Sequence, residues 1–132
     1  MGTAINSHKD LIVWQKAMDL VVAVYTLTEC FPKSEQYGLV SQMRRAAVSI
    51  PSNIAEGYRR GTKKDYRNFL IISLGSGSEL DTQIDIAMRV RLTTQQQSAE
   101  VITLLVEVLK MLNCMVHTLD ERSTPYTLHP TP

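Results

Sequence analysis

Polar side chains recur at helical spacing inside two otherwise apolar segments, 44–56 and 73–83. Within each segment they follow one another every three or four residues, which places them on one face of a helix. We name this set the polar seam, and it comprises Arg44, Arg45, Ser49, Asn53, Glu56, Ser76 and Glu79. An unsatisfied buried polar group costs about 1–3 kcal/mol, so two helices that carry such groups are expected to pair them with each other.

If the chain folds back near Gly61, the two halves of the polar seam lie side by side. Arg44 or Arg45 then lies level with Glu79, and we expect an ion pair between them. The same register predicts a hydrogen-bond network made by Ser49, Asn53, Ser73 and Ser76. The polar seam is either a purely structural network or the lining of a small-molecule pocket, and the sequence leaves both alternatives open.

Cations cluster around the expected turn between these two helices. We name this cluster the basic turn, and it comprises Tyr58, Arg59, Arg60, Lys63, Lys64, Tyr66 and Arg67. Lysine and arginine neutralise phosphates, and tyrosine rings stack on unpaired bases, as in proteins that bind single strands of RNA or DNA. Asp65 is the one acidic residue expected to oppose the cations, and five phosphate contacts would give a salt slope of roughly −3.5 to −4.5. The alternative is an ordinary solvated turn.

Catalytic and metal sites are not indicated by the sequence. His8, His117 and His129 fall in separate regions, with no serine or cysteine at a spacing that would make a nucleophile and its base. Glu56 and Glu79 fall several helical turns apart, which is too far for a carboxylate pair. We therefore expect no enzymatic activity, no cofactor and no metal.

Composition indicates one domain of ordinary globular character. The chain has 132 residues, of which 44% are hydrophobic and 20% charged, with a net charge of +1. No apolar run approaches the ~20 residues that cross a bilayer, and the first nine residues lack the features of a secretory signal. We expect a soluble, cytoplasmic protein with no membrane partner. Cys30 and Cys114 lie in apolar patterns, which predicts reduced thiols in the core.

Four segments have helical periodicity. The first follows Asp10, a candidate N-cap, and stops at Pro32; the second runs from about Leu39 to Tyr58. The third is capped by Thr62 and runs from 65 to 90, and the fourth begins at Thr93 or Thr94 and ends near 119. The first and fourth helices each carry two neighbouring apolar stripes, so we expect one stripe in the core and the other against another subunit.

Two details test this assignment. Pro51 lies inside the second helix, where we expect a kink rather than a break, and the small residues 75–78 are expected to remain helical. The inward positions predicted for the third helix are Phe69, Ile72, Ser76, Glu79, Gln83, Ile86 and Val90.

These elements predict an all-α fold, an antiparallel up-down-up-down four-helix bundle over residues 10–121. Residues 1–9 are expected to be a flexible N-terminus. Prolines and threonines replace the periodicity in residues 122–132, which predicts a disordered tail.

One pattern resembles a known family. The residues Arg-Arg-Ala-Ala-x-Ser-Ile-x-x-Asn-Ile-Ala-Glu-Gly at 44–57 and Gly-Ser-x-x-Glu-Leu at 75–80 are similar to the 23S rRNA-intervening-sequence proteins, bacterial four-helix bundles, as is the opening helix from Asp10 to Leu20. The resemblance covers roughly residues 10–119. It implies a homopentameric ring and no enzymatic activity. Relatives include the accessory protein of diversity-generating retroelements. For that relative, the resemblance implies a basic surface that engages nucleic acid and a reverse transcriptase.

Two functions therefore remain open at this stage. The first is a nucleic-acid-binding accessory ring that uses the basic turn. The second is an adaptor or assembly scaffold that binds a protein, with no role for nucleic acid. The net charge of +1 is low for a dedicated nucleic-acid binder.

Overall fold

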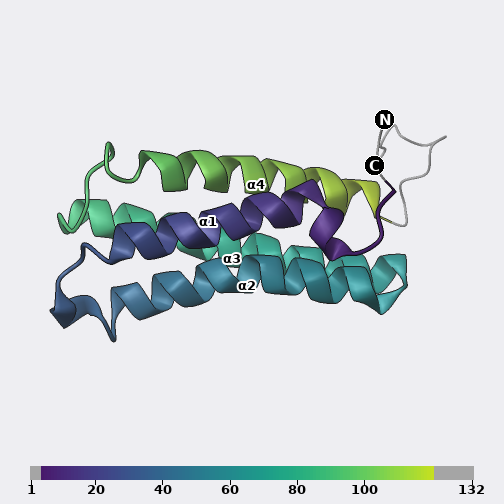
Figure 1. The fold of residues 1–132 in the computed structure, drawn as a ribbon, viewed down its shortest axis with the longest axis horizontal. Helices are drawn as coiled ribbons and strands as arrows, with labels where there is room; N and C mark the ends of the chain where they lie inside the picture. The colour runs from purple at the N-terminus through teal and green to yellow at the C-terminus, as the bar shows by residue number, and fades with distance from the viewer. Residues whose placement is uncertain (1–3, 121–132) are drawn as a thin grey trace.

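The chain folds as a four-helix bundle in a computed structural model that describes residues 4–120 (Figure 1). The helices are α1 (Ile12–Thr28), α2 (Leu39–Arg60), α3 (Lys63–Arg89) and α4 (Ala99–Thr118). Two short 3-10 helices, His8–Asp10 and Lys33–Glu35, precede α1 and α2. The described residues contain no strand, so the predicted all-α four-helix fold is confirmed.

The bundle is held together by one hydrophobic core to which every helix contributes. The most extensive helix pair is α2 with α3, and α1 packs against both α2 and α4 while α3 also packs against α4. Its largest fully buried side chains are Leu20, Met43, Ile50, Ile54, Leu70, Leu80, Ile84 and Leu112. Burying one such side chain contributes about 1.5–3 kcal/mol.

The turn between α2 and α3 follows the local pattern of the sequence. Gly61 ends α2 in the left-handed conformation, with φ of 92°, which glycine adopts without strain. Thr62 then caps α3, because its side-chain oxygen accepts the Asp65 N–H at 3.1 Å. The predicted cap is confirmed, and α2 extends two residues beyond the predicted Tyr58.

Two predicted helix starts are wrong. Asp10 does not cap α1; its carboxylate accepts the N–H of Asn6 at 2.8 Å and completes a capping box with Ser7 around the preceding 3-10 helix. The fourth helix begins at Ala99 rather than near Thr94, because the Thr94 and Gln97 side chains bond to each other's backbone N–H groups and form a separate turn. Of the predicted flexible segment 1–9, residues 1–3 lie outside the described residues. The predicted tail 122–132 also lies outside them.

The helix α2 continues without a break past Pro51, and α3 continues through residues 75–78, as predicted. Beside Pro51, the buried Ser73 hydroxyl on α3 donates to the Ile50 carbonyl oxygen at 2.9 Å. This bond ties α3 to α2 at the point where proline interrupts the helical hydrogen-bond ladder.

The predicted inward face of α3 is correct at Gln83, which is buried, and wrong at its apolar ends and at Glu79. Ile72, Ile86 and Val90 are 49%, 43% and 58% exposed, whereas the buried face comprises Leu70, Ser73, Gly77, Leu80, Gln83, Ile84 and Ala87. The physical reason is close packing. Serine, glycine and alanine on this face let α3 approach its neighbours, and a Cβ at Gly77 would come within 2.5 Å of Leu109 Cδ2.

Both cysteines are free thiols, but they are exposed rather than buried in the core. Cys30 lies just beyond the end of α1, and Cys114 lies on the outer side of α4. The prediction that both thiols are buried is wrong, because it rested on apolar neighbours in the sequence, which do not fix the side of the helix on which a residue lies.

Candidate functional site

The polar seam forms a hydrogen-bond network between α2 and α3 at its serine and asparagine positions. Ser76 Oγ donates to Ser49 Oγ at 2.8 Å, and the Asn53 amide donates to the Ser49 hydroxyl at 3.0 Å and to the Ser49 carbonyl oxygen at 2.8 Å. With the bond from Ser73, these contacts fix the register of the two helices. All members are partly or fully buried. Ser49, Asn53 and Ser76 bond to one another, and Ser73 bonds to the backbone of α2.

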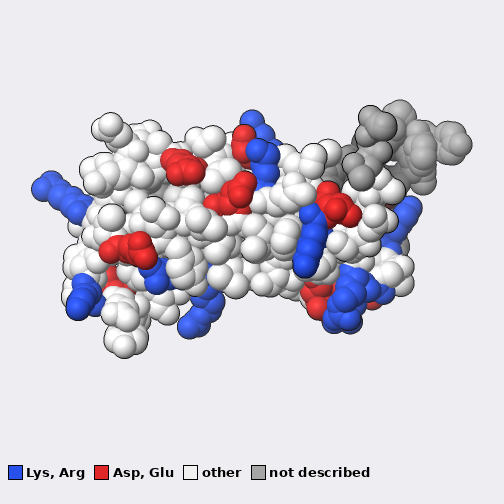
Figure 2. Space-filling model, viewed as in Figure 1, with Lys and Arg blue, Asp and Glu red and all other residues white. Residues whose placement is uncertain are grey.

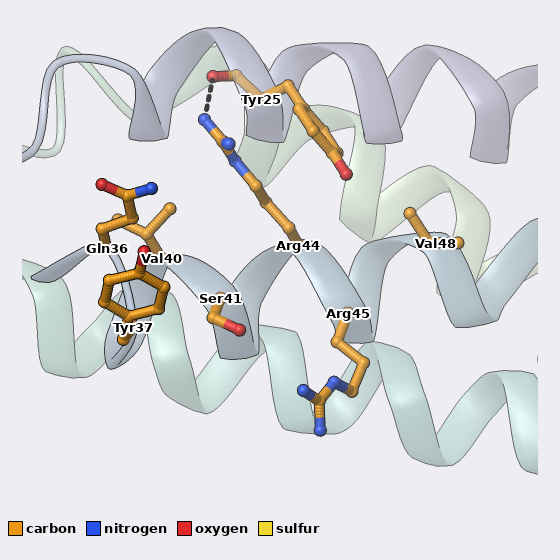
Figure 3. Close-up of a pocket in the computed structure, with 8 residues that line it drawn as sticks. All are labelled: Tyr25, Gln36, Tyr37, Val40, Ser41, Arg44, Arg45 and Val48. Carbon is orange, nitrogen blue, oxygen red and sulfur yellow. Dashed lines mark hydrogen bonds between the residues drawn. The ribbon is translucent and has the colours of Figure 1, made fainter.

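Neither Arg44 nor Arg45 pairs with Glu79, so the predicted ion pair is wrong. The Arg44 side chain crosses to α1, where its guanidinium donates to the Tyr25 carbonyl oxygen at 3.4 Å and lies 4.3 Å from the centre of the Tyr25 ring (Figure 3). The Arg44 Nε also donates to Thr28 Oγ1 at 2.9 Å. Arg45 is exposed and points away from α1 in Figure 3. The Glu79 carboxylate is also exposed, and from the residues that the structure describes it accepts one hydrogen bond, from the Gln83 amide at 3.4 Å.

Glu56 forms ion pairs with two arginines of the basic turn and takes no part in the hydrogen-bond network of the polar seam. Its carboxylate lies 3.0 Å from Arg59 Nη2 and 2.8 Å from Arg60 Nε. The hydrogen bond from Arg59, joined by the charges of Arg59 and Arg60, holds the pKa of Glu56 below its usual value against a smaller opposing effect of burial. Spacings of three and four residues on one helix were the signal that could have identified these pairs.

The basic turn brings its cations to one end of the bundle. In Figure 2, charged atoms gather at the lower right, where Figure 1 places the turn between α2 and α3. Lys63 and Lys64 are exposed and have no carboxylate partner among residues 4–120. Arg67 instead reaches α4, where Nε donates to the Val116 carbonyl oxygen at 3.0 Å and Nη2 lies 3.9 Å from Asp120.

Asp65 is therefore not the one acidic residue near these cations. The five cations share their end of the bundle with Glu56, Asp65 and Asp120, which leaves a local net charge of +2. The electrostatic attraction that this end exerts on phosphate is weaker than the count of cations alone suggests.

The aromatic residues of the basic turn contact each other. Tyr58 and Tyr66 are partly buried and pack edge to face with their ring centres 6.0 Å apart. Burial, helped by the neighbouring Tyr58, raises the pKa of Tyr66. Both rings line a hollow of about 330 Å³ that also includes Lys63, so an unpaired base that entered it would meet aromatic and cationic groups together.

A second surface, which the sequence did not single out as a site, lies between α1 and α2. A hollow of about 420 Å³ contains Tyr25, Arg44 and Val48, and an apolar hollow of about 370 Å³ continues from Val48. We name the two hollows the α1–α2 groove, and it is lined by Trp14, Met18, Val21, Tyr25, Gln36, Tyr37, Val40, Ser41, Arg44, Arg45, Val48, Pro51, Ser52 and Ala55. In Figure 2 much of the surface over the middle of α1 and α2 is uncharged.

The presence of two apolar stripes on α1, of which only one can face the core, was the signal for this groove. The first stripe, which includes Trp14, Met18 and Tyr25, is half-buried or exposed, while the other stripe supplies the core residues Val13 and Leu20. The second stripe of α4 behaves similarly at Val106, which is 45% exposed. The described chain thus leaves apolar side chains uncovered along two helices.

No candidate metal site of three or more acidic, histidine or cysteine side chains occurs among residues 4–120. His8 packs edge to face on Trp14 at 5.2 Å between ring centres, and His129 lies outside the described residues. No helix in this part of the chain combines the length and the apolar character that crossing a bilayer requires.

Comparisons with known proteins agree with this fold. A family model described as 23S rRNA-intervening sequence protein matches residues 9–114. A crystal structure of a protein of unknown function from the S23 ribosomal protein family of Bacteroides thetaiotaomicron VPI-5482 is similar with a TM-score of 0.72 and 24% identity, covering 80% of this chain and 98% of that chain. No curated protein matches the sequence.

Proposed function

This chain belongs to the 23S rRNA-intervening sequence protein family, and from that premise we propose that it is a non-enzymatic, cytoplasmic protein that assembles into a homopentameric ring and binds RNA. The short connections between α1, α2, α3 and α4 support an antiparallel up-down-up-down course within each copy. The uncovered apolar stripes support assembly, because each copy retains apolar surface that a neighbour would cover.

The observation that best supports the proposal of RNA binding is the local positive charge around the basic turn. In a chain of net charge +1, this one end holds a net charge of +2, and Lys63 and Lys64 have no carboxylate partner within residues 4–120. Repeated around a ring, the same feature would present several cationic ends to one phosphate backbone, so weak contacts would add by multivalency.

A measured salt slope would show how many cations take part. Contacts by the two free lysines alone would give a slope of roughly −1.4 to −1.8 for each copy, and contacts by all five cations would give roughly −3.5 to −4.5. The steeper value requires Arg59 and Arg60 to leave Glu56, so an intermediate slope is expected.

The decisive experiment is charge reversal at the basic turn. Arg59→Glu, Arg60→Glu and Lys63→Glu are made together, and mass by light scattering is recorded with and without single-stranded RNA at low and raised salt. The matched control reverses three exposed cations, Lys33 in the connection between α1 and α2 and Arg89 and Arg91 at the end of α3. Figure 1 shows that connection and the end of α3 at the end of the bundle opposite the turn between α2 and α3. Loss of RNA binding in the first variant alone, with the assembly intact, supports the proposal.

Retained RNA binding in the turn variant would remove the basic turn from this role. Absence of RNA binding by the wild-type protein would favour the second candidate, a protein-binding adaptor or assembly scaffold. That candidate is supported by the α1–α2 groove, whose apolar lining suits a protein helix better than a phosphate backbone.

A further inference from the structure

Arg44 is a positioned cation that has no counter-ion in the described part of the chain. Its guanidinium is held by the Thr28 hydroxyl, the Tyr25 carbonyl oxygen at 3.4 Å and the Tyr25 ring, all of which are uncharged. Thr28 is only 2% exposed, so the anchor is rigid. No carboxylate pairs with Arg44 among residues 4–120, although its head group borders the α1–α2 groove.

The α1–α2 groove places apolar surface at a defined distance from this cation. Arg44 and Pro51 lie seven residues apart on α2, which is about 10.5 Å along the helix axis. Pro51 lies in the apolar hollow with Trp14 and Met18, and Val48 joins that hollow to the one beside Arg44. A partner that fits the groove must therefore carry a carboxylate with an apolar group about two helical turns away.

One exposed face of α3 has this pattern. We name it the α3 stripe, and it comprises Ile72, Glu79, Ile86 and Val90, all exposed. Glu79 lies seven residues from Ile72 and seven from Ile86, again about 10.5 Å along the axis. The 3.4 Å contact with Gln83 leaves most of the acceptor capacity of the Glu79 carboxylate unused.

We propose that the α3 stripe of one copy docks into the α1–α2 groove of a second copy, with Glu79 against Arg44. Ile72 or Ile86, according to the direction in which the helices cross, then enters the apolar hollow beside Pro51. The ion pair that is missing within one chain is thus formed between chains. This inference rests on the assembly part of the proposed function.

The two docking surfaces differ, which has a consequence for the shape of the assembly. A contact between unlike surfaces is head to tail, so each copy uses its groove for one neighbour and its stripe for the other. Such contacts form a ring when the rotation between neighbours closes, as the proposed assembly requires, and an open filament when it does not. Like charges across such a contact are strongly unfavourable. Reversal of either charge is therefore expected to weaken self-association at least about tenfold.

The test uses charge reversal and its rescue on the full chain. Arg44→Glu and Glu79→Arg are each expected to lower the light-scattering mass at fixed concentration. The double variant is expected to reassemble, because every contact again joins opposite charges. Arg89→Glu and Asp85→Arg reverse exposed charges on α3 outside the stripe and should keep the wild-type mass.

Glu79→Arg is decisive even if Arg44→Glu fails to fold, because Glu79 is exposed and its replacement leaves the core intact; circular dichroism checks both variants. An assembled wild type whose mass is unchanged by Glu79→Arg would overturn this contact and leave the proposed assembly standing. A wild type that is monomeric at all concentrations would overturn the assembly itself, together with this contact.

Discussion

Two glycines inside helices are expected to respond in opposite ways to the same substitution. Replacing glycine by alanine in a helix interior gains about 0.8–1.0 kcal/mol of helix propensity. At Gly75 an added Cβ has no atom within 4 Å, so Gly75→Ala should gain that amount. At Gly57 the Cβ would lie 2.8 Å from Phe69 Cβ and 3.2 Å from the Tyr66 carbonyl oxygen.

The atoms that an alanine Cβ at position 57 would contact too closely belong to the backbone of α3 or are bonded to it. The steric clash can therefore be removed only if the whole helix shifts. Such overpacking costs about 1–3 kcal/mol, which exceeds or cancels the gain in propensity. We expect Gly57→Ala to lower the free energy of unfolding by up to about 2 kcal/mol. The two variants should therefore differ by about 1–3 kcal/mol, because the propensity gain is common to both.

Urea unfolding followed by circular dichroism measures this difference. Wild type and both variants are compared at one protein concentration, with light scattering to confirm equal mass, because assembly makes apparent stability depend on concentration. If Gly57→Ala unfolds at the same urea concentration as Gly75→Ala or at a higher one, the close approach of α2 and α3 at this position is wrong.

The remaining predictions concern buried and titrating groups. Gln83 is 4% exposed and its Oε1 has no partner among the described residues, so Gln83→Met should raise the free energy of unfolding by about 1 kcal/mol; a lower urea midpoint would contradict this. Because the pKa of Glu56 is lowered from 4.5, its pairing with Arg59 and Arg60 stabilises the fold above that pH and is lost as pH falls through the folded-state pKa; a carboxylate NMR titration with its midpoint at or above 4.5 would refute the pairing. Because the pKa of Tyr66 is raised from 10.0, stability should fall as pH rises past 10, where the unfolded chain ionises first; Tyr66→Phe should remove this loss, and an unchanged pH dependence would count against burial of the hydroxyl.

Local patterns predicted the parts of the fold that depend on neighbours in the chain. The cap by Thr62, the turn at Gly61 and the continuous helix past Pro51 all follow from contacts within a few residues. That serines of α2 and α3 share hydrogen bonds was also predictable, because one tight turn leaves little freedom in how two adjacent helices align.

Long side chains were not predictable in the same way. Arg44 or Arg45 was expected beside Glu79, yet neither pairs with it and Arg44 lies on the Tyr25 ring, because a flexible side chain on the edge of α2 can reach either neighbouring helix. Glu56 was assigned to the polar seam, yet two arginines on its own helix lie closer than any partner on α3. The choice among such partners depends on distances that only the packed helices define.

The sequence by itself determined that this chain makes four helices, that a capped turn joins two of them, and that serines lie close enough across that turn to share hydrogen bonds. It did not determine which serine pairs with which. Tertiary structure decided which face of each helix points inward. The third helix turned its small residues, Ser73, Gly77 and Ala87, to the core and left Ile72 and Ile86 exposed. Periodicity identifies residues that share a face, whereas the inward face is the one whose shape lets neighbouring helices pack most closely.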